Sequence, residues 1–539
     1  MDSRRGITNV VTSIFFKVVL LFANILVRRY LIRYIGNEIN GLNSLYISIL
    51  DFLSVAELGV GSAITFCMYK PVVDGDNDKI SALYGLFTKL YLGIGAIITV
   101  GGCLLMPVLP YLAKDYQNVD VNLYLTFGLM LISVVITYLF SSKISLINAY
   151  KNNYITTAIS SFGILLQCAL QIAVLICAKS FIWYLICRII AVVAQWGATE
   201  LITRIKYKII LKNKQYVDSE TKKDVVKNIK AMFMHKIGNM LVNTADSIII
   251  SSFIGLIVLG KYSNYTTIVS AMMGVLVLCF TPLTSIIGHA FVSEDGAQVV
   301  KYFNFFHVFN FLLGLIFFLG FYAVVDNLVS ALFGDGLELS KSISFVITIN
   351  FFIQFLRQTV MLFRDATGTF YNDRWKPLVE GLLNIALSIL FVKVFPEEYS
   401  VVGVIVATII TNLFICHIVE PHVLFKYAFK SSAKRYYIRN YAYIAVFAVA
   451  LVAVHFCSVD LSSVWAEFFA NGFIAIGLAL PICVGAVLLN KDFRHYLGVI
   501  INKFKLRRGK KPEVATVLNE TDDTKSDSEV DEISVDSQK

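Results

Sequence analysis

Charged residues are scarce in this chain of 539 residues, and the motifs that mark most enzyme classes are missing from it. Asp, Glu, Lys and Arg make up 16% of the chain, whereas 57% of the residues are hydrophobic. Globular proteins carry about a quarter charged residues. The apolar residues are grouped in long recurrent runs, which indicates a chain surrounded by lipid.

Cysteine chemistry and nucleotide chemistry have no sequence signature here. The 9 cysteines show no CxxC or CxH spacing. We interpret them as small buried hydrophobic residues, which excludes a disulfide framework and a cysteine-based metal site. There is no GxxxxGK[ST], no HExxH and no nucleophile elbow. The sequence therefore predicts no catalytic residues, no metal site and no bound cofactor.

About fourteen apolar segments, each roughly 20 residues long, are long enough to span a bilayer. We place them at 12–35, 42–67, 83–107, 122–142, 155–177, 181–203, 232–254, 263–287, 303–325, 342–363, 377–395, 400–424, 438–457 and 467–489. The fold class predicted is an all-α polytopic membrane protein.

Basic residues cluster in alternate loops, which fixes the predicted orientation. With the N-terminus inside, the inside loops include the basic segment 204–230 and the basic run 426–439. The outside loops offer little more than Lys114, Lys179, Lys261, Lys341 and Lys393. The positive-inside rule then places both termini in the cytoplasm. This distribution also argues that the net charge of +10 does not serve nucleic-acid binding.

The sequence contains an internal repeat with an offset of 219 positions. Eight identities occur without a gap over the 33 positions from Lys17 to Ile49, and they include Gly36 on Gly255 and Gly41 on Gly260. Because each copy holds an even number of spans, both copies have the same orientation, and a pseudo-two-fold axis should lie along the membrane normal. Two six-helix lobes, with two helices appended, are the predicted architecture.

The repeat and the changes in composition predict four parts of the chain. These are an N-terminal lobe at 1–216, a C-terminal lobe at 217–427, an appended helix pair at 428–490, and a tail at 491–539. The tail is basic at first and then acidic and polar, so we expect it to be disordered in the cytoplasm.

Charged and amide side chains lie inside several of the apolar segments. A charge at the centre of a span costs about 2.5–3.5 kcal/mol, so such charges normally face a cavity and mark a function. Many recur at helical spacing and thus share a face, as Asn350, Gln354 and Arg357 do. The residues predicted to line a substrate-binding cavity are Arg28, Arg29, Arg33, Arg188, Arg357, Lys17, Lys236, Asn24, Asn243, Asn350 and Gln354.

Cations outnumber anions in these predicted spans, which favours a ligand that is an anion with many oxygens. Arginine binds phosphate oxygens through two parallel hydrogen bonds, and amides suit sugar hydroxyls. Lys17, Lys89 and Arg33 have an alternative interpretation, in which they reach the headgroups. Asp246, Glu57 and Asp51 are candidates for coupling to a proton or sodium gradient, or else structural partners of nearby cations.

Two stretches of the sequence resemble a known family. RRYLIRYIGNEINGLNSLYISILDFLSVAELGVGSAITFCMYKPV, at 28–72, carries the patterns IGxExxGLxSL and AELGxGSA. It is similar to the start of Wzx-type oligosaccharide flippases, and DSIIISSFIGLIVLGKYSNYTTI, at 246–268, resembles the start of that family's second lobe. The resemblance covers roughly residues 5–490. It implies the MATE-like fold of the multidrug/oligosaccharidyl-lipid/polysaccharide (MOP) superfamily, with two six-helix lobes in a V around a central cavity.

The resemblance also implies a function and a location. The family moves polyprenyl-diphosphate-linked oligosaccharide repeat units from the cytoplasmic to the periplasmic leaflet of the bacterial inner membrane, for capsule or lipopolysaccharide synthesis. Membrane lipids and the polysaccharide polymerase machinery are the implied partners, and Arg33 occupies the place of an arginine that lipid II flippases carry before the first-span turn. An ion-coupled exporter of small molecules and a lipid II-type flippase are the alternatives. A membrane glycan polymerase or ligase is disfavoured by the short outside loops. The glycan, the coupling ion and the oligomeric state are not predicted.

Overall fold

The computed structural model describes residues 3–57, 60–212, 217, 240–241, 244–278, 280, 283–369 and 372–499, and the side chains of all of these except 3–18, 56, 62–64 and 285. Nearly all of these residues are helical. The predicted lobe boundary near residue 216 and the predicted tail beyond residue 499 lie outside the described residues.

The first half of the chain forms an N-terminal bundle. Its helices are α1 (Ser3–Tyr34), α2 (Asn37–Leu53), η1 (Ser54–Glu57), α3 (Val60–Asp74), α4 (Asn77–Leu105), η2 (Met106–Val108), α5 (Leu109–Leu112), η3 (Tyr116–Asn118), α6 (Leu123–Ala149), α7 (Asn153–Cys177), α8 (Phe181–Lys206) and α9 (Lys208–Lys212).

The second half forms a C-terminal bundle, which begins with the apolar helix Thr244–Ile254. The last turn of that helix is the π-helix η4 (Ile250–Ile254). The others are α11 (Leu256–Leu278), α12 (Leu283–Ser293), α13 (Gly296–Phe333), α14 (Lys341–Leu356), α15 (Gln358–Thr367), α16 (Lys376–Val394), η6 (Glu397–Tyr399), α17 (Ser400–Thr411), η7 (Asn412–Cys416), α18 (His417–Val423), η8 (Leu424–Phe429), α19 (Lys434–Cys457) and α20 (Val464–Leu489).

Polar residues begin several of these apolar helices. The side chains of Asp76, Asn122 and Ser463 accept hydrogen bonds from the first-turn amides of α4, α6 and α20. Each cap satisfies a backbone donor that has no partner inside the helix. In lipid such a donor would find no water, so an uncapped helix start would be more costly there than in water.

Ten helices of the described residues are long and apolar enough to cross a membrane. They coincide with ten of the fourteen predicted segments, which confirms the predicted all-α membrane fold. The segments at 12–35, 42–67, 232–254 and 263–287 are not among the ten. The second of these is divided into α2, η1 and α3, and the third begins before the described part.

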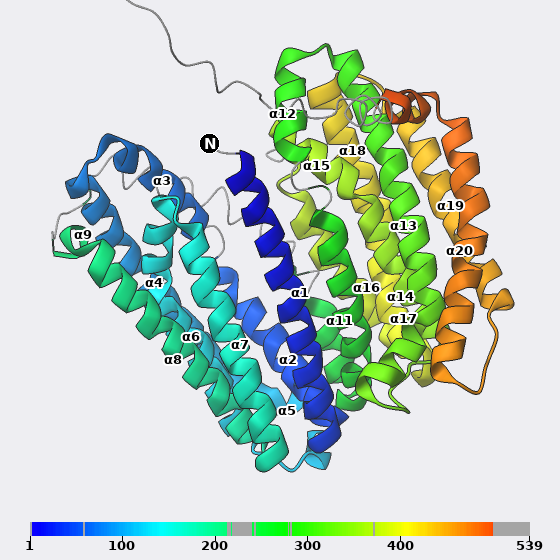
Figure 1. Cartoon of the computed structure of the whole chain (residues 1–539). Coiled ribbons are helices and arrows are strands. Elements are labelled where there is room, and N and C mark those ends of the chain that lie inside the picture. The colour runs from blue at the N-terminus through cyan, green and yellow to red at the C-terminus, as the bar shows by residue number, and fades with distance from the viewer. Residues whose placement is uncertain are drawn as a thin grey trace, which may run out of the picture.

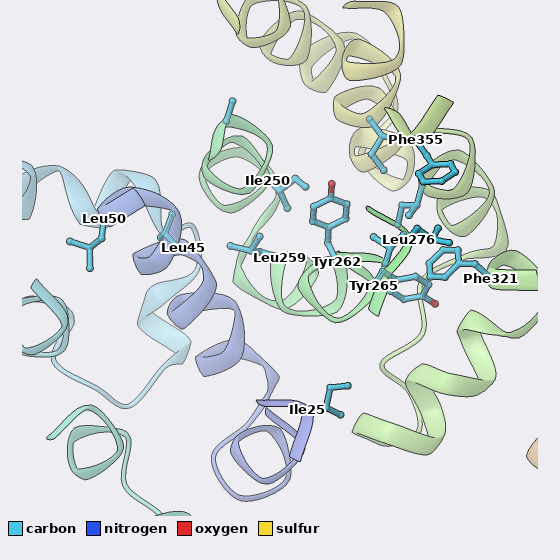
Figure 2. Packing of buried hydrophobic residues seen from close by; sticks show 14 of the residues in the cluster. Ile25, Leu45, Leu50, Ile250, Leu259, Tyr262, Tyr265, Leu276, Phe321 and Phe355 are labelled. Carbon is cyan, nitrogen blue, oxygen red and sulfur yellow. The ribbon is translucent and has the colours of Figure 1, made fainter. Parts of the chain in front are cut away.

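The two bundles lie side by side at one end of the molecule and diverge toward the end that carries the N-terminus (Figure 1). The main contact between them is made by α2 against α11, and α1 also touches α13. Within this contact Leu45 of α2 lies across from Leu259 of α11 (Figure 2). Both leucines are fully buried.

The two copies of the repeat share one backbone geometry at their most similar point. Gly36 has φ 121° and ψ 162°, and Gly255 has φ 139° and ψ 167°. An L side chain rarely adopts these angles, so glycine is required at both turns. The first predicted span therefore continues through its three arginines and ends at Gly36. Its counterpart ends at Gly255.

Candidate functional site

Arg28 joins the two bundles through neutral hydrogen-bond acceptors. One guanidinium nitrogen donates to Ser263 Oγ at 3.0 Å and to Asn264 Oδ1 at 3.2 Å, both on α11. Asn40 of α2 donates to the same Asn264 oxygen at 3.2 Å. The most prominent residue of the predicted cavity is thus bonded across the boundary between the bundles.

Small residues allow α2 and α11 to approach each other closely at this boundary. A Cβ added to Gly41 would lie 2.0 Å from the carbonyl oxygen of Leu256, and one added to Gly260 would lie 2.5 Å from that of Asn37. Neither distance is sterically possible. Gly41 and Gly260 are equivalent in the repeat, so both copies use glycine for this contact.

Two further cations bond to backbone carbonyls of the other bundle. Arg29 donates to the carbonyl oxygen of Ala331, near the end of α13, at 2.6 Å. Lys114, which follows α5, donates to the carbonyl oxygen of Phe253 at 3.1 Å. Carbonyls at helix ends carry partial negative charge, so both cations stabilise contact between the bundles.

A second arginine of the predicted cavity shares a neighbour with the first. Arg28 and Arg188 both interact electrostatically with Tyr184 of α8, and Asp51 of α2 interacts with Arg188. Asp51 is exposed, whereas Arg28 and Arg188 are partly buried. The structure therefore places Arg28 and Arg188 near one tyrosine, and Asp51 near Arg188.

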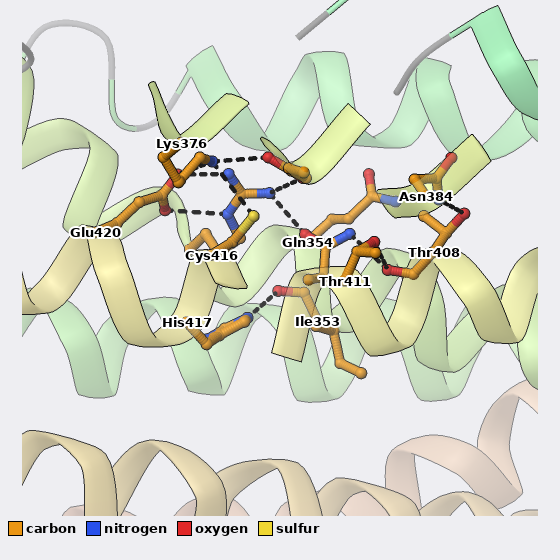
Figure 3. A network of polar contacts seen from close by, with 12 residues as sticks. Ile353, Gln354, Lys376, Asn384, Thr408, Thr411, Cys416, His417 and Glu420 are labelled. Atoms are coloured by element: carbon orange, nitrogen blue, oxygen red, sulfur yellow. Dashed lines mark hydrogen bonds and ion pairs between the residues drawn. The ribbon is translucent and has the colours of Figure 1, made fainter. Parts of the chain in front are cut away.

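A hydrogen-bonded row of side chains from three helices of the C-terminal bundle begins at Asp246. Thr408 Oγ1 of α17 lies 3.2 Å from Asp246 Oδ1, and it accepts a hydrogen bond from Asn384 Nδ2 of α16 at 2.8 Å (Figure 3). Asn384 Oδ1 and Ser388 Oγ are buried without a partner among the described residues. We call Asp246, Asn384, Ser388 and Thr408 the oxygen cluster.

The oxygen cluster has the composition of a cation site. No Lys or Arg in the described part of the chain forms an ion pair with Asp246. A buried polar atom without a partner costs about 1–3 kcal/mol, and two occur here one helical turn apart. Carboxylate, amide and hydroxyl oxygens are the ligands that hard cations prefer.

Arg357 forms an ion pair with a buried carboxylate, that of Glu420. At the junction of α14 and α15 it donates to both oxygens of Glu420, at 2.6 and 3.1 Å, and to Asn412 Oδ1 at 2.6 Å. Lys376 lies 2.8 Å from Glu420 and 2.8 Å from Glu380 (Figure 3). The side chains of Glu420 and Lys376 are 1% and 2% exposed.

A third cation completes this group, which we call the charged cluster: Arg357, Arg364, Lys376, Asp373, Glu380 and Glu420. Arg364 pairs with Asp373 at 3.2 Å. Burial raises the pKa of the Asp373 carboxyl, and Arg364 opposes that rise. The three cations thus meet three carboxylates, so the excess of cations seen in the predicted spans does not extend to this cluster.

One residue links the two clusters. Asn412 accepts from Arg357 and donates to the carbonyl oxygen of Thr408 at 3.0 Å. It begins the π-helix η7, where α17 gives way to α18. A π-turn frees backbone groups from the regular ladder and often marks a functional site.

The remaining predicted residues do not join these groups. Asn24 donates to the carbonyl of its own helix at Leu20, and Gln354 donates to Asn350 at 3.2 Å. Arg33 is exposed in the last turn of α1, and Glu57 lies in η1. The side chains of Lys17, Lys236 and Asn243 lie outside the described residues.

Sequence interpretation missed Glu420 and Glu380, and also Asn384, Ser388 and Thr408. Glu420 was detectable, because a carboxylate within an apolar span meets the same criterion that selected the arginines. The hydroxyls and the amide carry no such signal, since Ser, Thr and Asn are common in apolar helices and only the fold shows what they face.

Two solved structures share the fold of this chain. The lipid II flippase MurJ in an inward closed conformation matches at TM-score 0.61 and 13% identity, over 90% of this chain and 99% of that chain. An inward-facing multidrug resistance MATE family transporter of the MOP superfamily matches at TM-score 0.53 and 12% identity, over 74% and 94%. Models of known families and curated protein sequences give no match. At these identities the likeness establishes the fold, and the chain has the MATE-like fold that the sequence predicted.

Proposed function

We propose that this protein is a flippase that moves a polyprenyl-diphosphate-linked oligosaccharide from the cytoplasmic to the periplasmic leaflet by alternating access. The observation that carries the proposal is Arg28 of α1, which bonds across the contact of the two bundles, with Arg188 of α8 near the same residue, Tyr184. Arg28 bonds to neutral acceptors, so its positive charge is not cancelled there. Its remaining N–H groups are suited to diphosphate oxygens.

The arrangement of the bundles supports an inward-open state. With the N-terminus in the cytoplasm, as the positive-inside rule predicts, the end at which the bundles diverge would be cytoplasmic and the end at which they touch periplasmic (Figure 1). A substrate headgroup would then enter from the cytoplasmic leaflet. Its polyprenyl chain would stay in the lipid between the bundles.

Transport by reconstituted protein tests this proposal. Proteoliposomes would carry a fluorescent polyprenyl-diphosphate disaccharide, and a membrane-impermeant quencher would report the leaflet it occupies. Arg28→Gln and Arg188→Gln should each slow translocation at least about tenfold, since a charge-assisted hydrogen bond contributes about 1.5–3 kcal/mol. Arg435→Gln, which removes an exposed arginine at the start of α19, is the matched control. Unchanged rates in both cavity variants would refute the assignment.

The same assay separates the alternative functions. A wild-type protein that moves lipid II and no other glycan is a lipid II-type flippase. One that moves cationic dyes and no lipid-linked glycan is an exporter, and the flippase proposal is then wrong.

We further propose that the oxygen cluster binds the coupling cation, either sodium or a proton. Support comes from Asp246, which has a hydroxyl neighbour and no cationic partner in the described part of the chain, and from the two unpartnered oxygens on α16. Asp246→Asn should abolish the dependence of translocation on an imposed ion gradient. Asp74→Asn, at an exposed position, should preserve it. A gradient dependence that survives in Asp246→Asn contradicts this site.

A further inference from the structure

A basic pocket lies where the chain turns from η8 into α19. Its volume is about 760 Å³, and it opens to the surface of the C-terminal bundle. The polar side chains that line it are Lys426, Lys430, Lys434, His422, Ser431 and Ser432. The pocket is separate from the oxygen cluster and from the charged cluster, neither of which contributes a residue to it.

The positive charge of this pocket is not neutralised by the described residues. No ion pair joins Lys426, Lys430 or Lys434 to a carboxylate in the described part of the chain. The sequence contains no Asp or Glu between Glu420 and Asp460. All three lysines are exposed. Three ammonium groups around one opening attract an anion, and at a membrane surface each contributes about 1 kcal/mol.

The backbone of the turn holds these lysines around the opening. Lys430 adopts a left-handed conformation with φ 49° and ψ 40°, which ends η8 and reverses the chain toward α19. The amide of Ser431 donates back to the carbonyl of Phe425 at 3.1 Å. The three lysines therefore lie on a tight turn that is hydrogen-bonded to the preceding helix.

The pocket lies at the start of α19, which is long and apolar enough to span a membrane, so we expect it at the level of the lipid headgroups. The start of α19 is at the same end of the molecule as the N-terminus of the chain (Figure 1). Tyr437 lines the pocket, and Tyr427 lies beside it with its ring 5.3 Å from the ammonium of Lys426. Tyrosine and lysine together are typical of a membrane–water interface.

An apolar strip, made of the exposed side chains of Ile438, Ala442, Ala445 and Val449 at helical spacing, leads from the pocket along α19. The hydroxyl of Tyr437 donates to the carbonyl oxygen of Ile418 at 2.7 Å, and that of Tyr441 donates to Leu413 at 2.9 Å. These bonds hold α19 against α18 and η7. Beside them Ile438 is 66% exposed, which gives an acyl chain a surface directly below the lysines.

We propose that this pocket binds the phosphate headgroup of an anionic phospholipid of the cytoplasmic leaflet, with an acyl chain along the strip at Ile438. A soluble polyanion would use the lysines alone. A phospholipid uses both the lysines and the strip, and this difference identifies the ligand. The inference does not depend on the transported substrate.

Native mass spectrometry of the full-length protein tests the site. Protein would be released from nanodiscs that contain equal amounts of phosphatidylglycerol and phosphatidylcholine, and the lipids retained would be counted. The triple variant Lys426→Gln, Lys430→Gln, Lys434→Gln should retain phosphatidylglycerol at least about tenfold less than wild type, given about 1 kcal/mol for each lysine. Lys70→Gln, Lys151→Gln, Lys208→Gln removes three exposed lysines elsewhere and should retain it within about twofold.

A second variant distinguishes the two sources of phosphate. Ile438→Asn should lower retention of phosphatidylglycerol and leave binding of inorganic polyphosphate unchanged. Equal retention of both lipids by wild type, or a pocket variant that retains phosphatidylglycerol like the control, overturns the proposal. Polyphosphate binding with no lipid retention also overturns it. Transport by the pocket variants is measured separately. If they transport normally, a negative lipid result overturns the proposed lipid site and leaves the proposed transport function intact.

Discussion

Neutralising Glu420 should destabilise the C-terminal bundle more than any other single change to a carboxylate in the charged cluster. Glu420 accepts two bonds from Arg357 and one from Lys376, and it is almost fully buried. Removing one partner from a buried ion pair costs about 3–5 kcal/mol, because the other charge stays buried without compensation. Lys376 keeps Glu380 at 2.8 Å, but Arg357 keeps only Glu380 at 3.9 Å, so we expect Glu420→Gln to cost about 3–4 kcal/mol.

The charge balance of the cluster supplies the decisive comparison. In the double variant Glu420→Gln, Arg357→Gln, the pairs Lys376–Glu380 and Arg364–Asp373 remain, and no charge is left without a partner. The double variant should therefore recover at least about 1 kcal/mol of the loss.

Unfolding free energies in bicelles, measured by steric trapping, check this prediction. Asp74→Asn, which neutralises an exposed carboxylate, should stay within about 0.5 kcal/mol of wild type. A Glu420→Gln variant as stable as that control would contradict the prediction. A double variant no more stable than the single one would contradict the charge balance as well.

Three further predictions concern the bundle contact and the cation site. Gly41→Ala and Gly260→Ala should each push α2 away from α11, and distances between spin labels on the two bundles would reveal the separation. In the control Gly85→Ala the added methyl group has open space, so those distances should not change. Arg28→Ala removes two hydrogen bonds between the bundles, so it should shift the population toward the outward-open state about tenfold or more. The accessibility of cysteines introduced near α11 would report the shift, and an unchanged accessibility pattern contradicts the prediction. Thr408→Val removes the hydroxyl beside Asp246, so it should raise the sodium or proton concentration needed for half-maximal transport several-fold. Thr411→Val, one turn along the same helix, should leave that concentration unchanged.

The fold was largely predictable because lipid imposes a simple pattern on sequence. A span must satisfy its backbone hydrogen bonds internally, so apolar length alone located ten helices. The repeat located the turns at Gly36 and Gly255, since glycine is the residue that adopts those angles readily. Neither signal depends on which residues meet in space.

The partners of the charged residues were not predictable in the same way. Arg28 bonds to residues 235 and 236 positions away, and Arg357 bonds to a carboxylate 63 positions away. Helical spacing gives the face on which a side chain lies, but it does not give the neighbour of that face. Arg28 and Arg357 therefore look equivalent in the sequence, although one meets neutral oxygens and the other a carboxylate.

This difference in partners divides the predicted cations into two kinds. A guanidinium bonded to Glu420 has its charge compensated inside the C-terminal bundle, and its removal should weaken folding more than binding. A guanidinium bonded to Ser263 and Asn264 keeps its charge, and its partners belong to the other bundle. A separation of the bundles would remove those acceptors from Arg28 and leave it near Tyr184 of its own N-terminal bundle. An anionic headgroup that replaces the lost acceptors would bind more tightly to the conformation in which the bundles are apart at Arg28. A substrate can shift the equilibrium between two conformations only through such a difference in affinity.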